Sequence, residues 1–304
     1  MALDPDVKTW LDQLNASPVS FDGMEPAFLR QFMDLPFSTT SEPVLEVHDQ
    51  HIDGPLGVIP LRIYRATTDK SVPTIVFFHG GGFVFCTIDS HDALCRMLAN
   101  RLNAVVVSVG YRLAPEAKFP AAPNDCFAAV RWAAEHIDKL GGNINKLLVA
   151  GDSAGGNLAT VVCHMAKNQG PKIAHQLLFY PVIDGAMNTP SYQSCAEGYF
   201  LSRHMMEFFW LHYLENAEQA KNPLASPINA DCAGLPPATI ITAEFDPLCD
   251  EGEAYAAKLK NAGVSVSVKR YDGLIHGFLS LTDQFSAAKK ALDEVCVSVK
   301  KALA

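Results

Sequence analysis

The chain has 304 residues, of which 49% are hydrophobic and 19% are charged. This balance excludes a disordered protein, because disordered chains are poor in apolar residues and rich in charge. The formal net charge of −9 argues against an electrostatic grip on nucleic acid or on anionic membranes. No apolar run approaches the ~18 residues of a transmembrane helix, and the N-terminus lacks the cationic and apolar stretches of a secretory signal. We therefore expect a cytoplasmic protein with no membrane span and no nucleic-acid partner.

Most of the chain alternates β-branched apolar runs with amphipathic segments of helical length. Two early runs, 42–52 and 57–65, have no helix between them and predict an antiparallel pair at the edge of a sheet. Further strands are expected at 74–78, 104–109, 146–150, 175–180, 238–243 and 264–271, and helices at about 90–102, at about 125–137, from about 153 and at about 284–302. Continuous apolar strands separated by helices indicate an α/β fold, with a mostly parallel sheet flanked by helices on both faces.

Two segments interrupt this alternation. Residues 1–42 predict one or two short helices, and an aromatic segment at 197–214 lies within an insert, 185–227. This aromatic segment is either an amphipathic helix packed on the core or part of a helical cap. We favour a cap formed by 1–42 and 185–227 over a core of 43–184 and 228–304, because the insert follows a strand at the end where α/β sheets carry their sites.

The eight cysteines and ten histidines show no metal-binding spacing. There is no C-x-x-C pair and no H-E-x-x-H motif, so we expect no metal and no cofactor. Several cysteines lie in apolar periodic segments, as Cys126 does, and are interpreted as reduced thiols that act as small apolar side chains.

The most specific local motif is Gly151-Asp152-Ser153-Ala154-Gly155, between a strand and a helical pattern. A sharp turn at the carboxyl end of a strand exposes a serine hydroxyl as a nucleophile, and the flanking glycines leave room for the strained backbone. The alternative is a glycine-rich turn in which Ser153 only caps the helix.

A second motif, His79-Gly80-Gly81-Gly82-Phe83, follows the strand at 74–78. Attack on a carbonyl creates an oxyanion that needs preorganised N–H donors, and consecutive glycines let backbone amides face a site without obstruction. A phosphate-binding loop is the alternative, but no Walker lysine and no G-x-G-x-x-G spacing follow. We interpret His79 and Gly80 as supports of this loop.

With these motifs the chain resembles the bacterial hormone-sensitive-lipase-like carboxylesterases, family IV of the α/β-hydrolase superfamily. The matching segments occur in the family's order: HGGGF at 79–83, YRLAPE at 111–116, GDSAGG at 151–156, DPLCDEG at 246–252 and IHGF at 275–278. Phe83 stands where many members have tryptophan, which concerns the shape of the pocket. The resemblance implies an α/β-hydrolase fold with a helical cap.

The resemblance also implies a catalytic triad of Ser153, Asp246 and His276. Asp246 follows the strand at 238–243, and His276 lies between the strand at 264–271 and the last helix, in the order serine, aspartate, histidine. His276 would take the proton of Ser153 and pass it to the leaving alcohol, while Asp246 orients the imidazole.

The oxyanion-hole amides implied by the resemblance are those of Gly81, Gly82 and Ala154. For the substrate pocket we name four aromatic candidates, although periodicity does not assign their facing: Phe83, Tyr199, Phe200 and Phe209.

Three acidic residues near these motifs are given supporting roles. Asp250 is expected to cap the following helix or to support the site, Asp152 to serve as scaffold, and Glu116 to brace nearby loops.

The activity implied is hydrolysis of short-to-medium-chain carboxylic esters through an acyl-enzyme, with a small-molecule ester as substrate. One alternative is a non-catalytic binding protein similar to plant gibberellin receptors, which have lost the catalytic histidine that is present here as His276. Another is an amidase or deacetylase that uses the same triad, with a peptidase as the weakest form. Monomer and homodimer both stay open.

Overall fold

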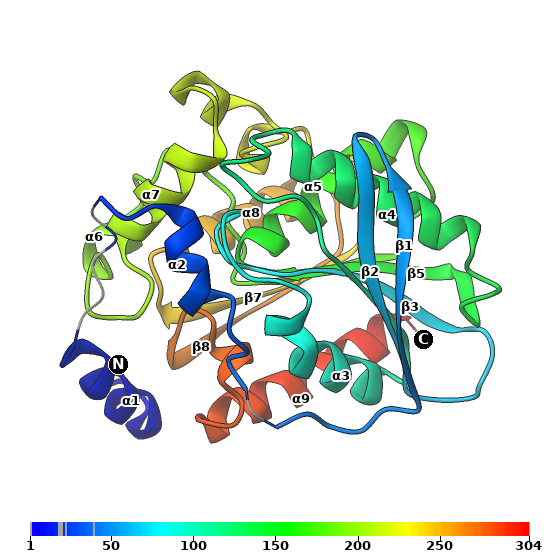
Figure 1. Cartoon of the computed structure of the whole chain (residues 1–304), viewed down its shortest axis with the longest axis horizontal. Helices are drawn as coiled ribbons and strands as arrows, with labels where there is room; N and C mark the ends of the chain where they lie inside the picture. Colours follow the sequence, from blue (N-terminus) through cyan, green and yellow to red (C-terminus); the bar gives the residue numbers. More distant parts are fainter. Residues whose placement is uncertain (1, 18–20, 22, 39, 304) are drawn as a thin grey trace.

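The computed structural model describes residues 2–17, 21, 23–38 and 40–303. In this part of the chain, eight strands form one sheet in the order β1-β2-β4-β3-β5-β6-β7-β8 (Figure 1). The strands are β1 (Glu46–Gly54), β2 (Gly57–Arg65), β3 (Val72–Phe78), β4 (Val105–Val109), β5 (Gly142–Asp152), β6 (His175–Phe179), β7 (Ala238–Phe245) and β8 (Val266–Ile275). β2 is antiparallel to both β1 and β4, and all other neighbours are parallel. The α/β fold, its mostly parallel sheet and the antiparallel edge pair are thereby confirmed.

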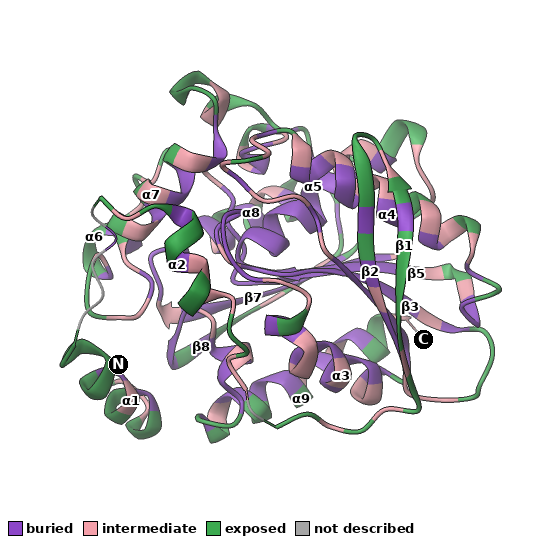
Figure 2. Cartoon of the chain, in the orientation of Figure 1, coloured by how far each residue is buried: buried purple, intermediate pink, exposed green. Residues whose placement is uncertain are grey.

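Helices cover both faces of the sheet, because the central strands are apolar on both sides. β4 and β6 are buried along their whole length, whereas β1 is mostly exposed (Figure 2). One face packs against α1 (Pro5–Asn15), α3 (Asp92–Leu102) and α9 (Ser286–Leu303). The other face packs against α4 (Ala121–Glu135), α5 (Ala154–Gln169) and α8 (Cys249–Asn261). The two apolar cores therefore lie on opposite sides of the sheet.

Four parallel strands, in two neighbouring pairs on either side of β6, end at the same edge of the sheet. Phe78 of β3 pairs with Gly151 of β5, and Phe245 of β7 pairs with Ile275 of β8. The segments that follow β3, β5, β7 and β8 therefore meet at this carboxyl edge, where parallel α/β sheets place their sites.

The N-terminal helices and the insert meet beyond this edge (Figure 1). The N-terminal segment carries α2 (Pro26–Met33), and the insert carries α6 (Ser191–Ser194) and α7 (Arg203–Tyr213). The Asn15 side chain donates a hydrogen bond to the Gly198 carbonyl at 3.0 Å, and the rings of Phe21 and Phe208 lie edge to face at 5.4 Å. Short 3-10 helices occupy η1 (Asp89–His91), η2 (Ala217–Lys221), η3 (Pro227–Asn229) and η4 (Phe278–Leu281).

Two helix boundaries differ from those expected. The helix predicted at 125–137 begins a turn earlier, at Ala121, because Pro123 falls in its first turn, where no backbone N–H is needed. Within the aromatic segment 197–214 the helix begins only at Arg203, since Gly198 and Phe200 take positive φ values of 85° and 74°.

All eight cysteines are free and buried. Among the helices that the structure describes, none has the length and apolarity needed to cross a bilayer.

Candidate active site

Ser153 stands in a strained turn between β5 and α5. Its backbone has φ 53° and ψ −118°, a conformation that L-residues rarely adopt and that clusters at functional sites. The turn is fixed from both sides, because the Ser153 N–H donates to the Phe179 carbonyl and the Ser153 carbonyl accepts from the Val182 N–H. A Cβ on Gly155 would lie 1.9 Å from the Phe78 carbonyl oxygen, so only glycine lets α5 approach β3 this closely.

His276 and Asp246 lie next to Ser153 in one hydrogen-bonded chain. His276 Nε2 lies 2.9 Å from Ser153 Oγ, and His276 Nδ1 lies 2.7 Å from Asp246 Oδ2. Asp246 is fully buried, and its other oxygen, Oδ1, accepts the Leu248 N–H at 2.8 Å. Because an ionised carboxylate only accepts, the Nδ1 proton of His276 points to Asp246 and leaves Nε2 free to accept from the hydroxyl.

The glycine loop after β3 faces the same point. Gly81 has φ +103°, and a Cβ on it would lie 2.2 Å from the Phe85 carbonyl oxygen. Among the described residues, the N–H groups of Gly81 and Gly82 do not donate to a backbone carbonyl. Ala154 is the first residue of α5, where a backbone N–H has no acceptor within its own helix. These three amides are available to stabilise an oxyanion.

His79 lies beneath this loop and contacts it directly. Its Nδ1 lies 2.7 Å from the Gly80 carbonyl oxygen, its ring stacks on Tyr111 at 4.3 Å, and the Tyr111 hydroxyl donates to the His79 carbonyl at 2.7 Å. Burial, with the nearby His91, lowers the pKa of His79 to about 3, so the ring is neutral near pH 7 and its Nδ1–H donates to Gly80.

A cavity adjoins Ser153. Its polar side includes Ser153, His276, Asp152 and His91. Most of its remaining lining is apolar: Met33, Phe37, Phe85, Phe200, Leu201, Met205, Phe209 and Leu281. The cavity therefore offers an apolar site beside the Ser153 hydroxyl.

Of the four aromatic pocket candidates, two line this cavity and two lie elsewhere. Phe200 and Phe209 face it. Phe83 instead stacks on Tyr213, with ring centroids 3.8 Å apart, and is 2% exposed. Tyr199 stacks on Phe245 at 5.0 Å. The structure therefore brings Phe200 and Phe209 to the site but does not bring Phe83 or Tyr199 there.

The three neighbouring acids take different positions. Asp152 lines the cavity and accepts from the Gly80 N–H at 2.9 Å. Glu116 makes a two-point ion pair with Arg30, which ties α2 to the segment after β4. Asp250 accepts from the Ser191 N–H at 2.8 Å and so joins α8 to the insert.

Sequence reasoning missed His91 and the residues of the N-terminal segment that line the cavity. Met33 and Phe37 lie on or just after α2, and His91 ends η1. No local motif marks these residues, and only the folded chain brings them to the site. Within the described chain, no group of three or more His, Cys, Asp or Glu side chains is placed to hold a metal ion.

Residues 75–280 match a family model described as the α/β-hydrolase fold. The chain belongs to this family. The resemblance to its hormone-sensitive-lipase-like carboxylesterases is confirmed by many esterase relatives of nearly the same length. The carboxylesterase NlhH of Mycobacterium tuberculosis is 36% identical over 99% of this chain and 96% of its own.

Solved structures of this family agree with the fold. A hyperthermophilic esterase of the archaeon Pyrobaculum calidifontis superposes with a TM-score of 0.94 at 40% identity and covers 100% of both chains. An ester hydrolase from the metagenome of Lake Arreo, solved with a bipyridine phosphonate derivative, gives a TM-score of 0.94 at 38% identity over 98% of each chain.

Proposed function

We propose that this member of the family is a serine carboxylesterase that hydrolyses short-to-medium-chain esters. The observation that carries the proposal is the continuous hydrogen-bonded chain from Asp246 through His276 to Ser153, which ends at an apolar cavity beside the glycine loop. Esterases of similar length and fold support it, and one of them binds a phosphonate derivative.

In this mechanism His276 Nε2 takes the Ser153 proton as Oγ attacks the ester carbonyl carbon. The amides of Gly81, Gly82 and Ala154 stabilise the oxyanion of the tetrahedral intermediate. His276 then gives the proton to the leaving alcohol, and Asp246 stabilises the imidazolium in between. Water attacks the acyl-Ser153 in the second half of the cycle, with His276 again as the base.

The acyl or alcohol part of the ester would occupy the cavity beside Ser153. Phenylalanine, leucine and methionine side chains dominate its lining, which suits a short or medium apolar chain. Segments 1–42 and 185–227 would form a cap over this cavity, since α2 contributes Met33 and the insert contributes Phe200, Met205 and Phe209. The core of the enzyme would then be 43–184 with 228–304.

Hydrolysis of p-nitrophenyl esters from acetate to palmitate tests the proposal. We expect the highest kcat/KM for acyl chains of two to eight carbons, and Ser153→Ala to lower kcat by about 10⁶. Ser267→Ala, at an exposed position on β8, is the matched control and should leave the rate unchanged. A wild-type protein without ester hydrolysis, or a Ser153→Ala protein with normal rates, would refute the proposal.

Labelling with a fluorophosphonate probe separates catalysis from binding alone. The wild-type protein should take up one probe at Ser153, and Ser153→Ala should take up none.

Matched p-nitrophenyl ester and p-nitroanilide substrates test the amidase alternative, because an amine leaving group demands firmer protonation by His276.

A further inference from the structure

His91 is a second buried histidine at the cavity, and the mechanism above does not use it. Its side chain is 1% exposed, yet it lines the cavity together with Ser153. Three rings surround it, those of Phe37, Phe77 and His79, with centroids 6.3, 6.0 and 5.6 Å away. A polar ring in such a place needs hydrogen-bond partners, because burial without them costs free energy.

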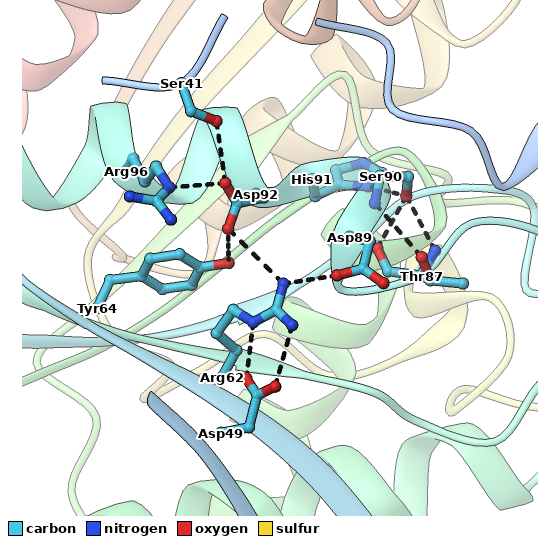
Figure 3. A network of polar contacts seen from close by, with 10 residues as sticks. All are labelled: Ser41, Asp49, Arg62, Tyr64, Thr87, Asp89, Ser90, His91, Asp92 and Arg96. Carbon is cyan, nitrogen blue, oxygen red and sulfur yellow. Dashed lines mark hydrogen bonds and ion pairs between the residues drawn. The ribbon is translucent and has the colours of Figure 1, made fainter. Parts of the chain in front are cut away.

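The polypeptide around His91 is anchored by a polar network (Figure 3). The next residue, Asp92, accepts from the Tyr64 hydroxyl at 3.0 Å and from Arg96 Nε at 2.6 Å. Arg62 pairs with Asp89, the first residue of η1, at 2.6 Å. The start of α3 is therefore fixed to β2.

Both ring nitrogens of His91 have partners. Nδ1 lies 2.9 Å from Ser90 Oγ, and Nε2 lies 3.2 Å from the Asp152 carboxylate and 3.4 Å from the Gly80 backbone nitrogen. Burial acts to raise the pKa of Asp152, but the neighbouring histidines, His91 foremost with His79 and His276, together lower that pKa below its usual range. The Asp152 carboxylate is therefore ionised near pH 7 and can only accept, so His91 Nε2 carries the proton.

Asp152 also bonds the glycine loop, so it links His91 to that loop. The same carboxylate accepts the Gly80 N–H at 2.9 Å, while His79 Nδ1–H donates to the Gly80 carbonyl. The Gly80 carbonyl and the Gly81 N–H belong to one planar peptide group and point in opposite directions. Fixing Gly80 at both its N–H and its carbonyl therefore fixes the direction of the Gly81 N–H.

We propose that His91 is a positioning residue of the oxyanion hole, acting through Asp152 and Gly80 on the amide of Gly81. His91 touches neither the nucleophile nor the general base in the hydrogen-bonded chain. Its effect would appear in the transition state, where the oxyanion develops, and not in the binding of the ester. This inference rests on the proposed esterase function.

Substitution of His91 by phenylalanine and by glutamine tests this role. Phenylalanine fills the site without an N–H, whereas glutamine keeps a donor that can reach Asp152. We expect His91→Phe to lower kcat by about 10- to 100-fold, because small misplacement of catalytic groups has effects of that size. KM should change by less than about threefold, since the loss is confined to the transition state. His91→Gln should recover most of the loss.

His175→Phe is the matched control for the loss of a buried histidine. His175 is 2% exposed and bonds Thr239 Oγ1 at 2.9 Å where β6 begins, the end of the strand opposite the site. Its variant should lower Tm without lowering kcat. Equal kcat losses in His175→Phe and His91→Phe, or no rescue by His91→Gln, would overturn the proposal.

If His91→Phe does not fold, Asp152→Asn provides a second test of the same proposal. The amide of this variant has one acceptor oxygen for two donors, the Gly80 N–H and the His91 Nε2–H. We therefore expect kcat to fall about tenfold with KM unchanged. The rate of inactivation by a fluorophosphonate should fall by the same factor, because the phosphonyl oxygen occupies the oxyanion position. An Asp152→Asn enzyme with wild-type kcat would overturn the proposal, whereas an inactive wild-type protein would refute the esterase function itself.

Discussion

The two carboxylate oxygens of Asp246 have different partners, one in the loop after β7 and one in the site. Oδ1 accepts the Leu248 N–H and holds the loop after β7, while Oδ2 holds His276 Nδ1. This division lets a single substitution affect the histidine while the loop keeps its hydrogen bond.

We predict that Asp246→Asn lowers kcat by about 10⁴, because an amide facing Nδ1 favours the wrong imidazole tautomer. The amide oxygen can still accept from Leu248, so circular dichroism should show a folded protein. Asp250→Asn is the control, since Asp250 bonds the insert and not His276. An Asp246→Asn enzyme within tenfold of wild type would contradict the role assigned to Asp246.

At the residue scale, the motifs and the family resemblance that they carry were enough to propose the triad, and the strands that precede its members supported it. The role of His91 could not be predicted in the same way. Its contact with Asp152 spans 61 residues of sequence and depends on how the start of α3 sits against β2. The direction in which the Phe83 and Tyr199 rings point could not be predicted either, because both residues lie in irregular segments where side chains follow no helical or strand periodicity.

Among the elements, α8 joins the insert to the loop that carries Asp246. Glu251, in its first turn, is 1% exposed and accepts from the N–H groups of Ile183 and Asp184, which follow β6. The Ser191 hydroxyl of the insert donates to the Pro247 carbonyl at 2.6 Å. The base of the insert and the loop after β7 are thereby held against the same helix.

Glu251 gives this junction a pH dependence. Burial raises the pKa of Glu251 well above its ordinary 4.5, against the effect of the two backbone N–H donors. A raised pKa in the folded state means that the folded protein binds the proton more tightly than the unfolded chain. The contribution of Glu251 to stability is therefore complete below the unfolded pKa and declines as pH rises toward the folded pKa.

We predict that the stability of Glu251→Gln does not decline in this way with rising pH, because the glutamine amide does not ionise. Its oxygen can still accept the Ile183 N–H. The free energy of unfolding in urea, measured at about pH 5 and pH 8, should fall less between the two in the variant than in wild type. Glu253→Gln, at a more exposed position on the same helix, is the control. Identical pH profiles for wild type and Glu251→Gln would contradict a raised pKa of Glu251.

Most elements of the sheet were predictable because continuous apolar runs mark buried parallel strands. Their boundaries were not, as the start of α4 shows, where Pro123 was compatible with the first helical turn. How the N-terminal segment meets the insert was also beyond the sequence pattern, since contacts such as Phe21 with Phe208 join residues far apart in the chain.

On the scale of the whole molecule, the free cysteines are spread over both cores of the sheet. Cys126 and Cys163 lie in one core, and Cys95 and Cys296 in the other. Burial raises the pKa of the Cys95, Cys163 and Cys296 thiols, so their reactive thiolate form is suppressed.

We predict that a thiol reagent such as DTNB labels the native protein slowly and all eight cysteines after unfolding in guanidinium. Tm should be the same with and without a reducing agent. Rapid labelling of several thiols in the native protein would contradict the burial described above.

The order in which the sheet brings its loops together has a consequence for synthesis on the ribosome. The glycine loop and Ser153 come from β3 and β5, which pair directly, whereas Asp246 and His276 come from β7 and β8 at the far side of β6. Because the chain is synthesised from its N-terminus, the glycine loop and Ser153 leave the ribosome before Asp246 and His276. The proposed nucleophile is therefore present in the growing polypeptide without its proposed base, and the hydrogen-bonded chain from Asp246 to Ser153 is complete only once β8 has folded.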